Sequence, residues 1–212
     1  MAKLHFLITA GGTREYIDPV RFISNASSGR MGYSLAQAAV KAGHKVTLIT
    51  TIKNPRFKIK NLKLKIVEVE TANQMFLAVR RYFRHSDCLI MAAAVSDYKP
   101  FKKSKVKIKK TNKNLIIKLK PTVDILRWAG KNKKKNQIVV GFALEDKNLR
   151  KNAEKKLIEK NLDMIIANNL VAIGAENAAV QIETADGRWI KMPTAGKTTI
   201  AARIIRLAED LY

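Results

Sequence analysis

The sequence contains a single cysteine, Cys88, among its 212 residues. One cysteine excludes an internal disulfide framework and is typical of a protein from a reducing compartment. No apolar run approaches the ~20 residues that a membrane-spanning helix needs. The short apolar stretch at residues 4–10 leads directly into Gly11 and Gly12, which fits a first strand and its turn better than a signal peptide. We therefore expect a cytoplasmic protein without a membrane partner.

Acidic residues are also scarce. The chain has 17 Asp and Glu against 41 Lys and Arg, which gives a formal net charge of +24. Residues 99–135 alone contain 15 basic residues and one acid, Asp124. This charge indicates either a face that binds phosphates or nucleic acid, or a lysine-rich composition on solvated surfaces. A single-stranded nucleic acid would need aromatic side chains between the basic ones, and this stretch has only Phe101 and Trp128, so we expect no specific nucleic-acid partner.

The first half of the chain alternates between buried strands and helices. Its apolar runs are short and nearly continuous, as in parallel strands that are covered on both faces. The first helix is followed by Gly43, a common helix stop, and the second is preceded by a capping-box spacing at residues 71–74. The predicted strands are residues 4–9, 45–50, 64–69 and 88–93, and the predicted helices are residues 31–42 and 72–84.

The second half adds two hairpins to this pattern. Residues 106–110 and 115–118 alternate with period two and predict an exposed hairpin, and Asp186-Gly187 predicts the turn of a late one between 180–183 and 188–191. The remaining predicted strands are 138–142 and 164–167, and the remaining helices are 148–160 and 197–211. We expect one α/β domain over residues 1–212, a Rossmann-like, mostly parallel sheet with helices on both faces, with a flap and dimerisation elaboration at about 99–120.

Glycine and serine residues flank the start of the first predicted helix. Gly11 and Gly12 leave the first strand, and Ser27, Ser28 and Gly29 precede the helix. Glycines let the backbone approach an anion closely, and a helix N-terminus supplies unpaired N–H groups. Because open α/β sheets bind ligands at the carboxyl ends of their strands, these residues predict a phosphate site there. The alternative is a structural loop in which Ser28 only caps the helix.

The glycine spacing disfavours two common nucleotide motifs. Sixteen residues separate Gly12 from Gly29, far more than the dinucleotide-binding G-x-G-x-x-G sequence permits, so a nicotinamide oxidoreductase is disfavoured. The segment Gly196-Lys197-Thr198 is similar to the end of a P-loop. However, Lys191 stands where that motif requires its first glycine.

Asp97 follows three alanines at the end of the fourth predicted strand. Small residues such as Ala93 and Ala94 leave room for a ligand, and Asp97 can accept a hydrogen bond from a ribose or help to hold Mg²⁺. The alternative is that Asp97 only caps a turn.

Two pairs of lysines are further candidates for phosphate binding. Lys107 and Lys109 lie on one face of the predicted flap hairpin, where lysines also commonly protect an exposed sheet edge. Lys156 and Lys160 are four residues apart on a predicted helix, so both ammonium groups lie on one face. They form either a grip for a polyphosphate or a solvated stripe.

With these motifs in hand, the chain resembles the phosphopantothenoylcysteine synthetase family, the phosphopantothenate–cysteine ligases of coenzyme A biosynthesis, in its stand-alone bacterial form. The most specific segment is DPVRFISNASSGRMG at 18–32. The other matching segments are ITAGGTRE at 8–15, AAVSDY at 93–98, KIKK at 107–110, VDIL at 123–126, VGFA at 140–143, KNLD at 160–163 and AN at 167–168. They occur in family order across nearly the whole chain.

The resemblance implies a two-step ligase reaction. The carboxylate of 4′-phosphopantothenate attacks the α-phosphorus of CTP, with Mg²⁺, and releases pyrophosphate. The amine of L-cysteine then displaces CMP from the acyl nucleotide. ATP in place of CTP is the alternative, because eukaryotic relatives use it. The resemblance also implies a homodimer, and, because the chain starts at the synthetase strand, neither flavin nor decarboxylation.

The resemblance also assigns roles to residues. Asn25 corresponds to the asparagine that binds the acyl nucleotide, and Lys107 to the lysine of a mobile flap that closes over the triphosphate. Arg21, Ala93 and Ala94 are candidates for substrate binding. The residues expected at the nucleotide are Gly11, Gly12, Ser27, Ser28, Gly29, Ala93, Asp97, Val123, Asp124, Ile125, Leu126, Phe142, Lys156 and Lys160. The sequence assigns no metal ligands.

Overall fold

The computed structural model describes residues 3–53, 63–169 and 177–212. Its strands are β1 (His5–Ala10), β2 (Arg14–Tyr16), β3 (Phe22–Ser24), β4 (Lys45–Thr50), β5 (Leu64–Glu68), β6 (Cys88–Met91), β7 (Tyr98–Pro100), β8 (Leu119–Pro121), β9 (Ile138–Glu145), β10 (Met164–Asn169), β11 (Asn177–Ala178), β12 (Val180–Thr184), β13 (Trp189–Lys191) and β14 (Ala195–Gly196). Its helices are α1 (Arg30–Lys41), α2 (Ala72–Phe83), α3 (Ile125–Asn132), α4 (Leu149–Glu159) and α5 (Lys197–Leu211). Within these ranges, no helix is long and apolar enough to cross a membrane.

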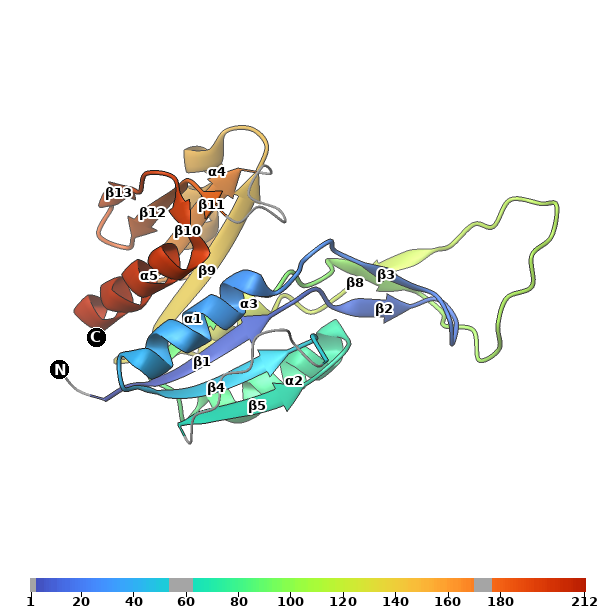
Figure 1. The fold of residues 1–212 in the computed structure, drawn as a ribbon. Helices are drawn as coiled ribbons and strands as arrows, with labels where there is room; N and C mark the ends of the chain where they lie inside the picture. Colours follow the sequence, from blue (N-terminus) through green and yellow to red (C-terminus); the bar gives the residue numbers. More distant parts are fainter. Residues whose placement is uncertain (1–2, 54–62, 170–176) are drawn as a thin grey trace.

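Eight strands form one mixed sheet in the order β13-β12-β10-β9-β6-β1-β4-β5 (Figure 1). In this order, the strands β5, β4, β1, β6, β9 and β10 pair in parallel with their neighbours. The strands β12 and β13 add an antiparallel hairpin next to β10. The chain moves from β1 outward to β4 and β5, then returns to the other side of β1 with β6. This order is that of a doubly wound dinucleotide-binding fold. The predicted fold class and late hairpin are therefore confirmed.

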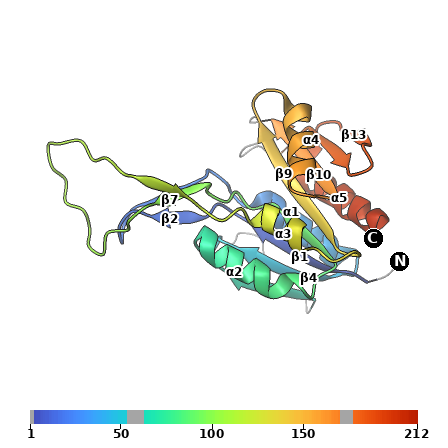
Figure 2. The same cartoon turned by 180° about the vertical axis from the view of Figure 1, so that it is seen from behind.

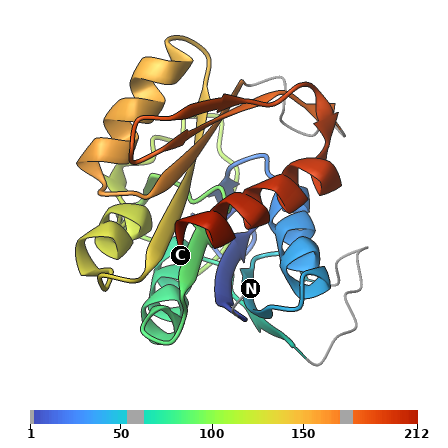
Figure 3. The same ribbon diagram turned by 90° about the vertical axis from the view of Figure 1, so that its left-hand side faces the viewer.

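Helices cover both faces of the sheet (Figure 3). Phe6 and Ile8 of β1 pack into one buried cluster with α1 and α5, whereas Leu7 packs into a second cluster with α2, α3 and α4. Because neighbouring side chains of a strand point to opposite faces, a strand covered on both sides must be apolar throughout. The core therefore explains the continuous apolar runs, and it includes the buried thiol of Cys88.

Glycines allow α1 to pack directly on the end of β1. A Cβ atom on Gly32 would lie 2.5 Å from the Cβ of Ala10 and 2.7 Å from the carbonyl oxygen of Thr9. Gly29 has φ of 73° and occupies the N-cap position, where no side chain caps the helix. The alternative that Ser28 only caps α1 is therefore wrong. The capping box that begins α2, by contrast, is confirmed, with Thr71 as its N-cap.

A long arm projects from the carboxyl end of the sheet (Figures 1 and 2). Its base consists of two antiparallel pairs, β2 with β3 and β7 with β8. The prediction of a regular hairpin at 106–110 and 115–118 is wrong, because residues 101–118 contain no strand. Val106 is 71% exposed and Ile116 is 90% exposed, so the apolar side chains of the alternation have no core to cover. A two-stranded ladder without such packing is marginal in water.

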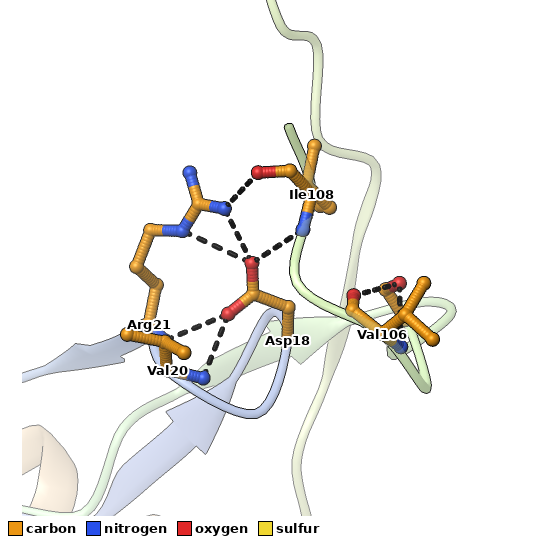
Figure 4. A network of polar contacts seen from close by, with 6 residues as sticks. Asp18, Val20, Arg21, Val106 and Ile108 are labelled. Carbon is orange, nitrogen blue, oxygen red and sulfur yellow. Dashed lines mark hydrogen bonds and ion pairs between the residues drawn. The ribbon is translucent and has the colours of Figure 1, made fainter. Parts of the chain in front are cut away.

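The carboxylate of Asp18 ties this arm to the β2–β3 turn (Figure 4). Its side chain is fully buried and accepts hydrogen bonds from the backbone N–H groups of Val20 (2.8 Å) and Arg21 (2.9 Å). It also accepts from the backbone N–H of Ile108 in the arm (3.1 Å) and from the Arg21 guanidinium (2.6 Å). The same guanidinium donates to the carbonyl of Ile108 (2.6 Å). One carboxylate therefore organises the turn and holds the arm.

These contacts also determine the protonation of Asp18. Burial raises the pKa of this carboxyl, but the hydrogen bonds from the three backbone N–H groups and from Arg21 lower it further, so the pKa lies well below its ordinary value. A carboxylate with a lowered pKa stabilises the folded protein fully above its unfolded pKa of about 3.9. That contribution is lost as the pH falls through the folded pKa.

The tight contact at Gly32 predicts a loss of stability in Gly32→Ala. Alanine has the better helix propensity, but its methyl group overlaps Ala10 and Thr9, and overpacking of this kind costs about 1–3 kcal/mol. We expect the free energy of unfolding, measured by urea denaturation, to fall by that amount. Gln37→Ala, on the exposed side of the same helix, should change it by less than about 0.5 kcal/mol. Equal stability of the Gly32→Ala and wild-type proteins would refute the close approach.

The Asp18 network predicts that Asp18→Asn releases the arm. An amide cannot serve all of these donors, so hydrogen exchange at residues 104–110 should become at least about 10-fold faster at neutral pH. The difference in stability between wild type and variant should shrink once the pH falls below about 3.9, because Asp18 of the unfolded chain is then protonated while the folded carboxylate, with its lower pKa, still resists protonation. Asp186→Asn is the control, since Asp186 accepts hydrogen bonds in the β12–β13 turn instead. Unchanged exchange in the arm of Asp18→Asn would contradict the anchoring role.

Candidate functional site

A pocket of about 710 Å³ opens at the carboxyl ends of the parallel strands. It lies where the chain order reverses between β1 and β6, the position at which doubly wound sheets bind their ligands. The carboxyl end of the sheet is also the end that faces the arm (Figure 1). The pocket is lined by residues 25–31, 91–95, 97, 122–126, 142, 144, 145, 156, 160, 168, 178 and 197.

The loop before α1 forms one wall of this pocket. The side-chain nitrogen of Asn25 donates to the carbonyl oxygens of Ala94 (3.4 Å) and Val95 (3.1 Å), which joins the loop to the segment that follows β6. The backbone N–H of Gly29 donates to the Ser27 hydroxyl (3.4 Å). The predicted serines and Gly29 therefore stand at an uncapped helix N-terminus, a favourable place for an anion.

The opposite wall comes from α3 and α4. Asp124 caps α3 by accepting from the backbone N–H of Arg127 (2.9 Å), and its other oxygen pairs with Nζ of Lys160 (2.9 Å). Burial raises the pKa of Asp124, but these two partners lower it more, so the net pKa is below its ordinary value. Asp124 therefore holds the ammonium group of Lys160 in place, and Asp124 itself lines the pocket. The sequence predicted these residues at one site, and the structure places them together.

Lys156 is a partly buried cation of the pocket. Its ammonium group donates to the carbonyl oxygen of Phe142 (2.7 Å). Burial lowers its pKa, and the nearby charge of Lys160 lowers it further. Lys156 and Lys160 thus both face the pocket, although Lys160 follows the last helical residue and caps α4. The two lysines therefore do not form a solvated stripe, since both line the pocket and bond to protein groups there, and a grip on a polyphosphate stays a prediction.

The end of β6 supplies the floor between these walls. The backbone N–H of Ala93 donates to the hydroxyl of Thr9 (3.1 Å), which fixes the segment to β1. Ala93 and Ala94 present only methyl groups, and the exposed Asp97 lies beyond them at the start of the arm. The carbonyl oxygen of Asp97 accepts from the backbone N–H of Thr122 (2.8 Å), so it also joins the two strands of the arm base.

Four predicted residues lie outside the pocket. A Cβ added to Gly11 would lie 2.2 Å from the Thr51 hydroxyl, and one added to Gly12 would lie 2.5 Å from the carbonyl oxygen of Asn25. These two glycines therefore let the loop pack closely against Thr51 and Asn25, and they do not line the pocket. Arg21 is bound to Asp18, and Lys107 is exposed on the arm. These four residues therefore do not line the pocket of their own chain, and their roles at the nucleotide or the substrate stay predictions.

The structure also adds residues that the sequence did not single out. Arg30, Asn168, Ala178 and Lys197 line the side of the pocket formed by α1, β10 and α5. Lys197 stands at the first position of α5 and not in a loop that wraps a phosphate. The segment 196–198 is therefore not a P-loop, as its glycine spacing indicates. Nothing in the local sequence relates Lys197 to Arg30, because their contact depends on the packing of α5 against α1.

The pocket does not contain a protein-built metal cage among the residues that the structure describes. No three His, Cys, Asp or Glu side chains in these ranges come together as metal ligands.

Comparison with known proteins identifies the family of this chain. Residues 1–211 match the family described as the DNA/pantothenate metabolism flavoprotein C-terminal domain. The chain is 42% identical over 209 residues to the coenzyme A biosynthesis bifunctional protein CoaBC of Bacillus subtilis (strain 168), covering 95% of this chain and 50% of that protein. It is 43% identical over 203 residues to a cysteine/cysteine sulfinic acid decarboxylase of an unknown prokaryotic organism, covering 94% of this chain and 56% of that protein.

The solved structures agree with these relatives. The crystal structure of the C-terminal domain of a coenzyme A biosynthesis bifunctional protein CoaBC has a TM-score of 0.82 and 38% sequence identity to the chain, covering 98% of this chain and 95% of that one. The chain spans about half the length of the curated relatives that it matches. The resemblance found in the sequence motifs is confirmed, and the chain belongs to the family of DNA/pantothenate metabolism flavoprotein C-terminal domains.

Proposed function

We propose that this chain is a phosphopantothenate–cysteine ligase that condenses 4′-phosphopantothenate with L-cysteine through an acyl nucleotide. The observation that carries the proposal is the pocket at the sheet switch point, which collects Asn25, the serine–glycine loop and the paired lysines of α4. Similarity to a domain of a coenzyme A biosynthesis protein, at 38% identity and nearly full coverage, supports it.

The first step joins the carboxylate to the nucleotide. A carboxylate oxygen of 4′-phosphopantothenate attacks the α-phosphorus, and the bond from that phosphorus to the bridging oxygen of the β-phosphate breaks. Pyrophosphate leaves with the electron pair, so no proton transfer is needed. The protein has mainly to align the reactants and to neutralise phosphate charge. We assign these tasks to the Ser27–Gly29 loop, to Lys156 and Lys160 and, once it covers the nucleotide, to Lys107 of the arm.

The second step makes the amide bond. The amine of L-cysteine attacks the acyl carbon, its proton is released to solvent, and the nucleoside monophosphate leaves with the electrons of the broken anhydride bond. We propose that Asn25 holds the acyl nucleotide during this step. The bonds from its side-chain nitrogen to Ala94 and Val95 fix the orientation of the amide, which leaves its carbonyl oxygen for the ligand.

We infer CTP as the nucleotide, with ATP as the alternative. The inference rests on the bacterial-type arm and on the segment of Phe142, which lines the pocket. Mg²⁺ would enter with the triphosphate and supply positive charge between its oxygens. Asp97 offers the pocket an exposed carboxylate, which fits an ion that is bound mainly by phosphates and water.

We also propose a homodimer built through the base of the arm. Exposed apolar side chains gather on β3, β7 and β8, on the turn between β2 and β3 and directly after β7, where burial would remove them from water. They are Val20, Phe22, Tyr98, Phe101 and Leu119, with exposures from 41% to 58%. Arg21 stands at the same turn and outside the pocket of its own chain. A second copy would allow Arg21 to reach the phosphate of the substrate in its partner's pocket.

Release of pyrophosphate tests the proposed function directly. With 4′-phosphopantothenate and Mg²⁺, we expect CTP to give pyrophosphate before L-cysteine is added, and CMP with phosphopantothenoylcysteine afterwards. Faster release of pyrophosphate with ATP than with CTP would change the assigned nucleotide and leave the proposed ligase reaction unchanged. No release with CTP, ATP, GTP or UTP would refute the ligase.

Asn25→Ala should abolish product formation and retain nucleotide binding. The side chain contacts the loop after β6 and not the helix N-terminus that receives the phosphates, so the dissociation constant for CTP should change by less than about 3-fold. Turnover should fall at least about 100-fold, the scale found for groups that orient a reacting centre. Loss of CTP binding as the main defect would contradict this role.

The dimer can be tested with the same variant. Asn25→Ala and Arg21→Gln should each be inactive alone, and a mixture of the two should regain about a quarter of wild-type activity, because a mixed dimer contains one intact pocket and half of the dimers are mixed. A mixture that stays inactive would refute the contribution of Arg21 across the dimer.

A further inference from the structure

Helix α4 ends in a turn that sets the direction of Lys160. The backbone N–H of Asn161 donates to the carbonyl oxygen of Ile158 (3.1 Å), and the backbone N–H of Leu162 donates to that of Leu157 (2.9 Å). Asn161 has φ of 52°, in the left-handed region. These two bonds and this conformation form a Schellman motif, in which glycine is the usual left-handed residue. The turn itself therefore does not require the side-chain amide of Asn161.

The amide of Asn161 bonds instead to the neighbouring helix α3. Its side-chain nitrogen donates to the carbonyl oxygen of Gly130 (2.8 Å), a buried residue of α3. At the same place, a Cβ added to Gly130 would lie 1.8 Å from the carbonyl oxygen of Lys160. The two helices therefore meet backbone against backbone, and the Asn161 amide is a side-chain bond across this contact.

Helix α3 holds Lys160 at both ends of the residue. The carbonyl oxygen of Lys160 packs on Gly130, and its Nζ pairs with Asp124, the N-cap of the same helix (2.9 Å). The Lys160 side chain is only 19% exposed, so its ammonium group lies along the wall of the pocket. A shift of the end of α4 away from α3 would separate the ammonium group from Asp124. The place of this charge in the pocket thus depends on the contact between the two helices.

We propose that Asn161 is a positioning residue for Lys160. Its left-handed turn ends α4, and its amide fastens that end to α3, so that the ammonium group of Lys160 is held beside Asp124 in the pocket. Asn161 is not among the residues that line the pocket, so it acts through Lys160. Lys156 bonds to the carbonyl oxygen of Phe142 and does not depend on this contact. The inference rests on the proposed function for the identity of the ligand, a nucleoside triphosphate.

The variant Asn161→Gly tests this role, because glycine keeps the left-handed turn and removes only the amide. By calorimetry, we expect CTP to bind about 3- to 10-fold more weakly, the scale of one lost hydrogen bond. In a Lys160→Met background, the same substitution should cause less than about 2-fold further loss, because the residue through which it acts is gone.

Asn148→Gly is the matched control. Asn148 stands at the other end of α4, is exposed like Asn161 and has the same φ of 52°, but its side chain makes no capping hydrogen bond. Its substitution by glycine should therefore leave the affinity for CTP within about 2-fold of wild type, as for a surface substitution away from such contacts.

A second measurement needs no nucleotide. Acetylation of the free protein by acetic anhydride, followed by peptide mass spectrometry, reports how well each lysine ammonium group is held. In Asn161→Gly we expect Lys160 to react about 2- to 5-fold faster, the scale of a weakened ion pair with Asp124. Lys155 on the exposed side of α4 is the internal reference and should react at the same rate in both proteins.

The results separate this inference from the proposed function. Wild-type affinity for CTP together with a wild-type acetylation rate of Lys160 in Asn161→Gly would overturn the positioning role. A loss of affinity that persists in full in the Lys160→Met background, or that equals the loss in Asn148→Gly, would show a general effect on the fold and also overturn it. A wild-type protein that binds no nucleoside triphosphate would refute the ligase, and the acetylation rate of Lys160 would still decide whether Asn161 positions this lysine.

Discussion

Helix α1 approaches strand β1 so closely that Gly32 has no room for a methyl group. An added Cβ would lie 2.5 Å from Ala10, and Gly29 lies against Gly11 in the same way. This contact fixes the direction of α1 and aims its first turn at the carboxyl end of β1. The walls of the pocket depend on it, because Asn25, Ser27 and Gly29 precede the helix and move with it. The position of α5 depends on it as well, since α5 packs on α1.

The arm follows a different principle from the sheet. The sheet is held by apolar side chains that are buried on both faces, whereas the outer arm has exposed apolar residues and no strands between 101 and 118. Its described contact with the β2–β3 turn is polar and centres on Asp18, Arg21 and Ile108. Polar anchors of this kind fix one end of a segment without fixing its length. Lys107 directly precedes Ile108, so the anchor also fixes the part of the arm that carries this lysine.

The net charge of +24 acquires a more specific meaning in the pocket. Much of the lysine excess lies on exposed surface, as at residues 131, 134 and 135, and a lysine-rich composition accounts for it. Within the pocket, the position of each charge matters more than the total. Lys160 is held by Asp124, whereas Lys197 stands at the first position of α5 on the other side of the pocket.

The sequence by itself determined the elements, the family and most of the site. The two-sided apolar runs predicted the parallel sheet, the 71–74 spacing predicted the cap of α2, and Asn25, Asp97, Asp124, Phe142, Lys156 and Lys160 do meet in one pocket. Local patterns carry this information, because burial on both faces and helix capping depend on neighbours in the chain. The tertiary structure alone decided that Arg21 and Lys107 lie outside the pocket and that residues 106–118 form no strands. It also brought Arg30 to Lys197, 167 residues away in the sequence. No local pattern encodes that meeting, because it arises from the packing of two helices on one face of the sheet.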